Sequence, residues 1–347
     1  MTDLNELLTV PRLDRALEGD LKAALDGKAK PPGALGRIED LALTLGLIQQ
    51  RLKPGVERPV LLVFAGDHGL TRSGVAAFPS GVTVAMVDTL LAGRASANAF
   101  ARVVGAEVRV IDAGVAADLS DRAGLVQAKI AWSTADASVE AAMTPVQAEE
   151  ALLAGARAAG DAIANGADLI ALGEMGIGNS ASAALLMHRL APAPLDDCVG
   201  QGAGHSPEGM ARKRAVLAQA AARTDATAPF EALTQFGGFE IAMMAGALLA
   251  SSKAGVPVLV DGFIGTAAAL LAIRLAPAAR DYCLFAHASA EAGHRLMLDA
   301  MDARPLLELD MRLGEGTGTL LAVPLVKAAC ALLSEVAELR DVLEAAG

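Results

Sequence analysis

Aromatic residues are scarce in this sequence, which holds one Trp, one Tyr and eight Phe, together 3% of the chain. Hydrophobic residues nevertheless make up 53% of it, and the mean hydropathy is +0.42. Ala, Leu and Val supply most of this apolar content. Such a composition is typical of tightly packed helices over a buried parallel sheet. With 347 residues, the chain is long enough for one large domain with a smaller partner.

Cysteine and histidine are also sparse. The three cysteines, Cys198, Cys283 and Cys330, are widely spaced and form no CxxC motif. We therefore expect buried free thiols in a reducing compartment rather than disulfides. The five histidines form no HxH or HxxxH pair, so the sequence predicts no metal site.

Long hydrophobic runs and basic clusters are largely missing. The apolar stretches 241–250 and 266–273 are shorter than the roughly 20 residues that a membrane span needs. The N-terminus carries Asp3, Glu6 and Asp14 instead of a basic, then apolar, signal. These features predict a cytoplasmic protein without a membrane partner. The net charge of −11 argues against nucleic-acid binding, which needs clustered Lys and Arg.

A unit of strand, polar or glycine-rich loop and small-residue helix recurs five or six times along the chain. Short apolar runs, typical of strands buried on both faces, occur at residues 59–64, 107–111, 168–172, 257–260 and 282–285. The pattern predicts an α/β fold with a parallel sheet covered by helices on both faces. We also expect helical structure over residues 1–27 and one helix over residues 82–104. Residues 115–143 show too weak a pattern to assign.

Ionisable side chains follow the ends of the expected strands. Each one alone is more often a structural cap than a functional group. In open α/β sheets, however, ligands bind at the carboxyl ends of the strands, so these groups should gather at one edge. The residues concerned are Asp67, His68, Glu174, Asp261, His287 and Glu315.

Two glycine loops suggest a phosphate site. Residues 173–180 follow a strand and precede a helix, an arrangement in which backbone N–H groups and the helix N-terminus attract an anion. A second loop covers residues 200–205 and precedes a helix with Arg212, Lys213 and Arg214. This basic cluster is either a solvated helix face or a phosphate-binding group centred on Lys213. No GxGxxG motif follows a strand, which disfavours a dinucleotide-binding oxidoreductase.

Glu315 stands between glycines in the stretch 312–318. Taken alone, this stretch could be a surface turn with a solvated carboxylate. The alternative is a carboxylate that a ligand can approach closely, since glycines leave the backbone uncovered.

Seven motifs occur together in the order of one known family. They cover residues 30–37, 67–69, 173–179, 212–216, 237–241, 261–263 and 313–318. The chain resembles nicotinate-nucleotide:dimethylbenzimidazole phosphoribosyltransferase over about residues 28–335. The resemblance implies transfer of the 5-phosphoribosyl group of nicotinate mononucleotide to 5,6-dimethylbenzimidazole, a step of cobalamin biosynthesis. It also implies a homodimer without a cofactor, in which a Rossmann-like domain (58–319) joins a small helical domain built from residues 1–57 and 320–347.

The resemblance assigns roles to individual residues. Glu315 would be the general base, and Glu174 would support the positive charge that develops at ribose C1′. The base would lie against Phe78, Ser80, Gly81 and Met175. The implied phosphate- and ribose-binding residues are Gly176, Gly178, Asn179, Ser180, Gly202, Gly204, Lys213, Glu240, Asp261, Ser289, Gly314 and Gly316.

Two departures from the family pattern concern the accepted base. Ser80 and Gly81 stand where family members usually carry a polar residue and a Glu, and Ala288 replaces a common Arg or Lys. These changes leave open a related enzyme that acts on adenine, another benzimidazole or a phenol. A non-catalytic nucleotide-binding protein is the further alternative.

Overall fold

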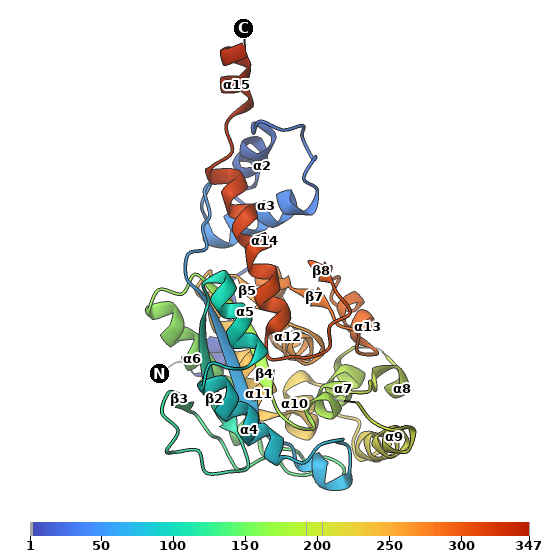
Figure 1. Cartoon of the computed structure of the whole chain (residues 1–347). Helices are drawn as coiled ribbons and strands as arrows, with labels where there is room; N and C mark the ends of the chain where they lie inside the picture. The colour runs from blue at the N-terminus through green and yellow to red at the C-terminus, as the bar shows by residue number, and fades with distance from the viewer. Residues whose placement is uncertain (1–2, 192, 203, 347) are drawn as a thin grey trace.

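The computed structural model describes residues 3–191, 193–202 and 204–346. Six parallel strands form its central sheet in the order β3-β2-β1-β4-β5-β6 (Figure 1). The strands are β1 (Pro59–Gly66), β2 (Glu107–Gly114), β3 (Leu125–Gln127), β4 (Leu169–Met175), β5 (Val258–Val260) and β6 (Cys283–Phe285). A parallel pair, β7 (His287–Ala288) and β8 (Leu307–Glu308), forms a second sheet. The predicted parallel sheet is thus confirmed, and β3 lies in the segment that the sequence left unassigned.

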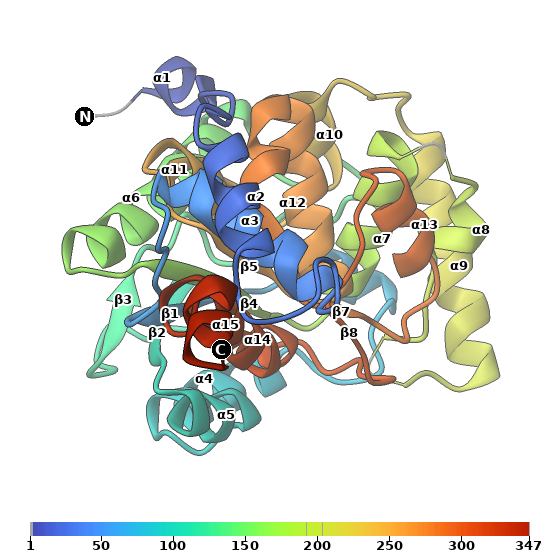
Figure 2. The ribbon, with the colours of Figure 1, turned by 90° about the horizontal axis from the view of Figure 1, so that it is seen from above.

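Helices cover both faces of the sheet, as Figure 2 shows from above. Leu62 and Phe64 of β1 pack into one core with the first layer, and Leu61 and Val63 pack into another with the second. This alternation is the two-residue period of a strand buried on both sides. The first layer contains α6 (Pro145–Ala164), α7 (Asn179–Leu190), α10 (Pro229–Phe236), α11 (Phe239–Lys253) and α12 (Phe263–Leu275). The second contains α2 (Glu18–Asp26), α3 (Arg37–Gln49), α4 (Gly81–Leu91), α5 (Ser96–Val104) and α14 (Thr317–Ser334).

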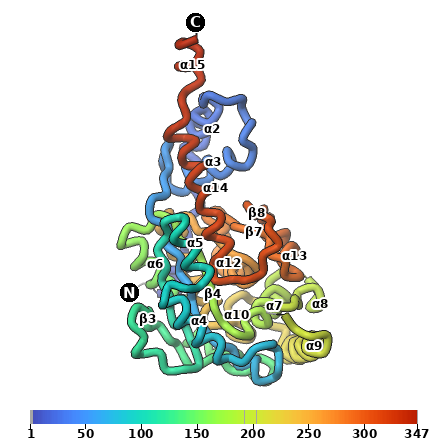
Figure 3. The backbone as a smooth tube through the Cα atoms, viewed as in Figure 1, coloured from blue at the N-terminus to red at the C-terminus, as the bar shows by residue number. Residues whose placement is uncertain are grey.

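The remaining helices are short or peripheral. They are α1 (Leu4–Leu8), η1 (Gly69–Ser73), α8 (Leu195–Cys198), α9 (Pro207–Ala222), η2 (Pro277–Tyr282), α13 (His294–Asp299) and α15 (Leu339–Ala346). Figure 3 shows α15 extending away from the body of the molecule at the C-terminal end. As expected, Cys198, Cys283 and Cys330 are buried free thiols.

Two helix predictions were wrong in their extent. The single helix expected over residues 82–104 is two helices, α4 and α5, because Gly93 adopts a positive φ of 72° between them. A left-handed residue ends an α-helix, and glycine takes this conformation without steric cost. The helical segment expected over residues 1–27 is likewise divided into α1 and α2. Pro11 lies between them, in a stretch without helical hydrogen bonds.

Segments from both ends of the chain pack side by side. Helix α14 contacts α3 and α2 (Figure 1). Lys28 Nζ forms an ion pair with Glu338 Oε1 at 2.8 Å. The division into a small helical domain and a large α/β domain stays a prediction, and its outermost residues 1–2 and 347 lie outside the described residues. Helix α14 starts beside the candidate site and reaches these terminal helices.

Among the described helices, α14 is long and apolar enough to cross a membrane by length and composition. In the fold, 61% of it is buried. It packs against α3 and α5, which is the behaviour of a core helix.

Candidate active site

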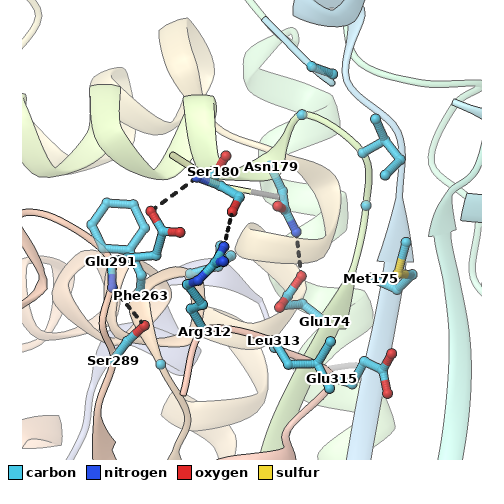
Figure 4. Close-up of a pocket in the computed structure, with 18 of the residues that line it drawn as sticks. Glu174, Met175, Asn179, Ser180, Phe263, Ser289, Glu291, Arg312, Leu313 and Glu315 are labelled. Atoms are coloured by element: carbon cyan, nitrogen blue, oxygen red, sulfur yellow. Dashed lines mark hydrogen bonds between the residues drawn. The ribbon is translucent and has the colours of Figure 1, made fainter. Parts of the chain in front are cut away.

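A pocket of about 370 Å³ lies at the carboxyl ends of the strands (Figure 4). Segments that follow β1, β5 and β6 reach it, together with Glu174 and Met175 at the end of β4. One part of its wall is apolar, with Val82, Met86 and Phe263. Of the predicted site residues, the lining includes Phe78, Glu174, Met175, Gly176, Gly178, Asn179, Ser180, Gly202, Asp261, Ser289, Gly314 and Glu315.

Glu315 occupies a constrained loop at this pocket. It has a φ of 60°, and its neighbours Gly314 and Gly316 have φ values of 90° and 79°. A left-handed glutamate is uncommon and costs conformational energy, which surrounding contacts must offset. A Cβ at Gly316 would lie 2.4 Å from Leu61 Cδ1, so a side chain there would force Leu61 to move. Glu315 itself is 5% exposed, which rules out the surface-turn interpretation.

The Glu315 carboxylate lies at the N-terminus of α5. The backbone N–H of Ala97 donates a hydrogen bond to Glu315 Oε2 at 3.5 Å. Burial raises the pKa of Glu315, the Ala97 N–H lowers it, and the negative charge of Asp261 raises it, with a net upward shift. A raised pKa makes the carboxylate a stronger base, as a group that accepts a proton from a substrate should be.

Asp261 fixes the loop that carries Glu315. Its Oδ2 accepts a hydrogen bond from Gly316 N at 3.1 Å, and its Oδ1 accepts one from Thr319 N at 3.2 Å. Both amides belong to the start of α14, where a carboxylate is favoured by the helix dipole. His287 Nε2 lies 3.5 Å from Asp261 Oδ1. Asp261 therefore lines the pocket while its oxygens are engaged by the Glu315 loop and His287.

Glu174 lies next to the same loop. A Cβ at Gly314 would lie 2.2 Å from Glu174 Oε1, so the absence of a side chain there lets the two segments meet. Asn179 Nδ2 donates a hydrogen bond to Glu174 Oε2 (Figure 4). Burial, followed by the charge of Asp261, raises the pKa of Glu174 to about 8. Glu174 is thus mostly protonated at neutral pH until a cationic group approaches it.

The first glycine loop leads into the N-terminus of α7. Gly178 has a φ of 96° and precedes the first helical residue, Asn179. Lys213 on α9 reaches this point, donating from Nζ to Ser180 Oγ at 3.1 Å and to Gly200 O at 2.9 Å. Burial lowers the pKa of Lys213 to about 8. A buried ammonium beside a helix N-terminus is a suitable receptor for a phosphate.

Six predicted site residues lie outside the pocket lining, which comprises only described residues: Ser80, Gly81, Gly204, Lys213, Glu240 and Gly316. Ser80 and Gly81 are exposed at the start of α4, whose Val82 and Met86 face the pocket instead. Glu240 is fully buried, and its Oε1 is 2.8 Å from His68 Nε2. Lys213 lies behind Ser180, and Gly316 packs against Leu61. Ala288, the other departure from the family pattern, is buried outside the lining.

Two charged residues of the pocket were not predicted. The backbone N–H of Gly202 donates to Glu291 Oε2 at 3.2 Å, and Arg312 Nη1 donates to Gly202 O at 3.2 Å. Arg312 sits within the stretch 312–318, and Glu291 follows the predicted Ser289 by two residues. Sequence spacing could not identify these two residues as part of the site, because their contacts join segments about 100 residues apart in the chain.

This fold and site are those of a phosphoribosyltransferase, as comparison with known proteins shows. A phosphoribosyltransferase family model matches residues 10–342, so the chain belongs to that family. Proteins from Cupriavidus taiwanensis and Dechloromonas aromatica, both named nicotinate-nucleotide–dimethylbenzimidazole phosphoribosyltransferase, are 52% and 51% identical to it. The alignments cover 94% and 93% of this chain and 95% and 94% of those proteins. The crystal structure of CobT from Thermus thermophilus is 44% identical, with a TM-score of 0.91 over 94% of this chain and 98% of that one.

Proposed function

We propose that the protein transfers the 5-phosphoribosyl group of nicotinate mononucleotide to 5,6-dimethylbenzimidazole. The products are α-ribazole 5′-phosphate, used in cobalamin biosynthesis, and nicotinate. The observation that carries the proposal is Glu315, a buried carboxylate held in a left-handed conformation at the wall of the pocket. The names of the relatives support the choice of substrates.

The reaction is a displacement at ribose C1′. The bond from C1′ to the nicotinate ring nitrogen is activated, since that nitrogen is cationic and leaves with the bonding electron pair as a neutral group. One benzimidazole nitrogen attacks C1′ from the opposite face, which inverts the β to the α configuration. The other ring nitrogen then loses its proton to a base, for which we propose Glu315. General bases of this kind contribute about 10²–10⁴-fold to a rate.

The other groups of the site would bind different parts of the substrates: ribose C1′, the 5′-phosphate and the aromatic base. Glu174 would support the positive charge that develops at C1′, regaining its own charge as the cationic pyridinium ring of the nucleotide approaches. Lys213 and the N-terminus of α7 would hold the 5′-phosphate. Phe78, Met175, Val82 and Met86 supply an apolar wall that suits a planar aromatic base.

We further propose that the protein acts as a cytoplasmic homodimer. We also propose a large α/β domain over residues 58–319 and a small helical domain built from residues 1–57 and 320–347. The contacts of α14 with α2 and α3 support the grouping of the chain ends. Measuring the solution mass by light scattering would test the dimer, and a monomeric mass at working concentration would contradict it.

Incubation of the purified protein with nicotinate mononucleotide and a panel of bases tests the function. We expect nicotinate release and α-ribazole 5′-phosphate with 5,6-dimethylbenzimidazole. Nicotinate release only with adenine, another benzimidazole or a phenol would show that this other base is the acceptor. The absence of release with every base would favour a non-catalytic nucleotide-binding protein.

A further inference from the structure

Glu291 holds the backbone amide that the second glycine loop would offer to a phosphate. We propose that its carboxylate occupies part of the phosphate subsite in the free protein and is displaced when the nucleotide binds. Glu291 is then an internal competitor that sets the affinity for phosphorylated ligands. This inference rests on the proposed function, because it takes Gly202 and Lys213 as parts of the phosphate subsite.

The Glu291 carboxylate is in direct contact with the backbone of the second glycine loop. Glu291 Oε2 accepts a hydrogen bond from Gly202 N at 3.2 Å. A Cβ at Gly200 would lie 1.9 Å from the same oxygen, so the carboxylate rests against the bare backbone of the loop. Glu291 is 9% exposed and belongs to the pocket lining. A carboxylate accepts backbone N–H groups with the geometry that a phosphate oxygen uses, so both ligands compete for this amide.

Two cationic side chains, Lys213 and Arg312, bond to the same loop. Arg312 Nη1 donates to Gly202 O at 3.2 Å. Lys213 Nζ donates to the neutral oxygens of Ser180 and Gly200, and no carboxylate among the described residues lies within 4.0 Å of it. Glu291 is near enough that its charge opposes the lowering of the Lys213 pKa by burial. The carboxylate therefore partly offsets the Lys213 charge that would attract a phosphate.

The backbone of Glu291 is fixed, so displacement has to come from its side chain. Ser289 N donates to His294 Nδ1 at 2.7 Å, and Glu291 N donates to Ser289 Oγ at 3.2 Å. Since Nδ1 accepts, the imidazole proton is on Nε2, which lies 2.9 Å from Thr266 Oγ1. This chain of bonds keeps the loop in place whichever direction the carboxylate takes.

Repulsion makes joint occupancy unfavourable. A phosphate on the Gly202 amide would bring its negative charge into contact with that of Glu291 in a shielded site, where like charges repel strongly. The nucleotide must displace the carboxylate, and the free energy of that displacement lowers its affinity. Removing the negative charge should therefore tighten phosphate binding, the reverse of what loss of a substrate-binding residue would do.

Glu291→Gln tests the inference, with Glu308→Gln as the control. Glu308 is an exposed residue of β8 outside the pocket lining, and its substitution causes the same change in net charge. We expect Glu291→Gln to lower KM for nicotinate mononucleotide by about tenfold, as a repulsion of this size would. The inhibition constant of inorganic phosphate should fall with it. The inhibition constant of the dephosphorylated nucleoside should stay unchanged, and Glu308→Gln should change none of these values.

An unchanged or increased KM in Glu291→Gln would overturn the inference. An equal change for nucleotide and nucleoside would also overturn it, because it would place Glu291 at the ribose. If the variant does not fold, a crystal structure of the wild-type protein with inorganic phosphate decides the matter. We expect phosphate on Gly202 N with Glu291 withdrawn, and a retained bond from Gly202 N to Glu291 beside bound phosphate would contradict it.

The proposed function and this inference can fail separately. If the wild-type protein releases no nicotinate, the function fails. Calorimetric titration of the wild-type protein and Glu291→Gln with inorganic phosphate still measures the competition, and equal affinities would overturn it.

Discussion

Glu315 and Glu240 are similar in sequence and different in structure. Each lies within two residues of a glycine, each belongs to a family motif, and each is buried. Glu315 lines the pocket and bonds weakly to one backbone amide at 3.5 Å. Glu240 lies outside the pocket lining and forms a 2.8 Å contact with His68, which is itself 1% exposed. The two carboxylates therefore differ in what they can contact. Glu315 can reach a substrate in the pocket, whereas Glu240 holds His68 behind the pocket lining.

Glycines create the space for the buried pair of His68 and Glu240. A Cβ at Gly66 or Gly238 would lie 2.8 or 2.5 Å from Glu240 Oε2. His68 lies under the first glycine loop, since a Cβ at Gly178 would lie 3.3 Å from its Cβ. Burial lowers the pKa of His68, but the charge and hydrogen bond of Glu240 outweigh it and raise the pKa overall. A hydrogen-bonded pair of His68 and Glu240 thus underlies the loop that we propose to bind phosphate.

The largest effect should come from Glu315→Gln. The amide keeps the shape of the side chain but cannot accept the benzimidazole proton, so we expect kcat to fall about 10²–10⁴-fold. Nicotinate mononucleotide should still bind with its wild-type dissociation constant, measured by calorimetry. Loss of nucleotide binding in a folded variant would argue against Glu315 as the base.

Lys213→Met should act on binding instead of on the chemical step. Met keeps most of the buried apolar length of Lys but loses the charge, so we expect KM for the nucleotide to rise about 10- to 100-fold. Arg214→Met, at an exposed neighbouring position of α9, is the matched control. Equal effects of the two substitutions would mean that only the general charge of α9 matters.

Glu240→Gln should affect stability first. Removing one charge of a buried pair leaves His68 without its counter-ion, and such changes cost about 3–5 kcal/mol. We expect this loss in denaturant unfolding, with a rise in nucleotide KM because the loop above His68 loosens. The exposed Glu231→Gln is the control. An unchanged unfolding free energy would show that the pair is not ionised.

Glu174→Gln should have the opposite effect on stability at alkaline pH. The folded-state pKa is raised from 4.5 to about 8, so the unfolded chain releases this proton first. Its contribution to stability is complete below about pH 4.5 and is lost as the pH rises through 8. We expect the variant to gain up to a few kcal/mol over the wild type at pH 8 and little at pH 4.5. An equal difference at both pH values would contradict the raised pKa.

Much of the fold follows from the sequence. The strands from β1 to β6, apart from β3, are short apolar runs, which is how strands buried on both faces are recognised. Strand β3 spans only Leu125–Gln127 at the sheet edge, too short for a pattern. The break between α4 and α5 rests on one glycine that takes a left-handed conformation, and glycine is also tolerated inside helices.

The site follows from the sequence only in part. Family motifs indicate which carboxylates matter, but the backbone of the Glu315 loop lies against Leu61 and Gly173, which are distant in the chain. Ser80 and Gly81 were expected at the base, yet the helix α4 turns Val82 and Met86 to the pocket, one helical turn apart. The place of Glu291 depends on a contact with Gly202, 89 positions away.

A crystal structure of the protein with 5,6-dimethylbenzimidazole and nicotinate mononucleotide tests the central claim most directly. We expect a ring N–H of the base at hydrogen-bond distance from the Glu315 carboxylate, about 2.6–3.2 Å. Glu240 should remain on His68 without touching either ligand. A benzimidazole bound away from Glu315, or a ligand in contact with Glu240, would contradict the division between the two carboxylates.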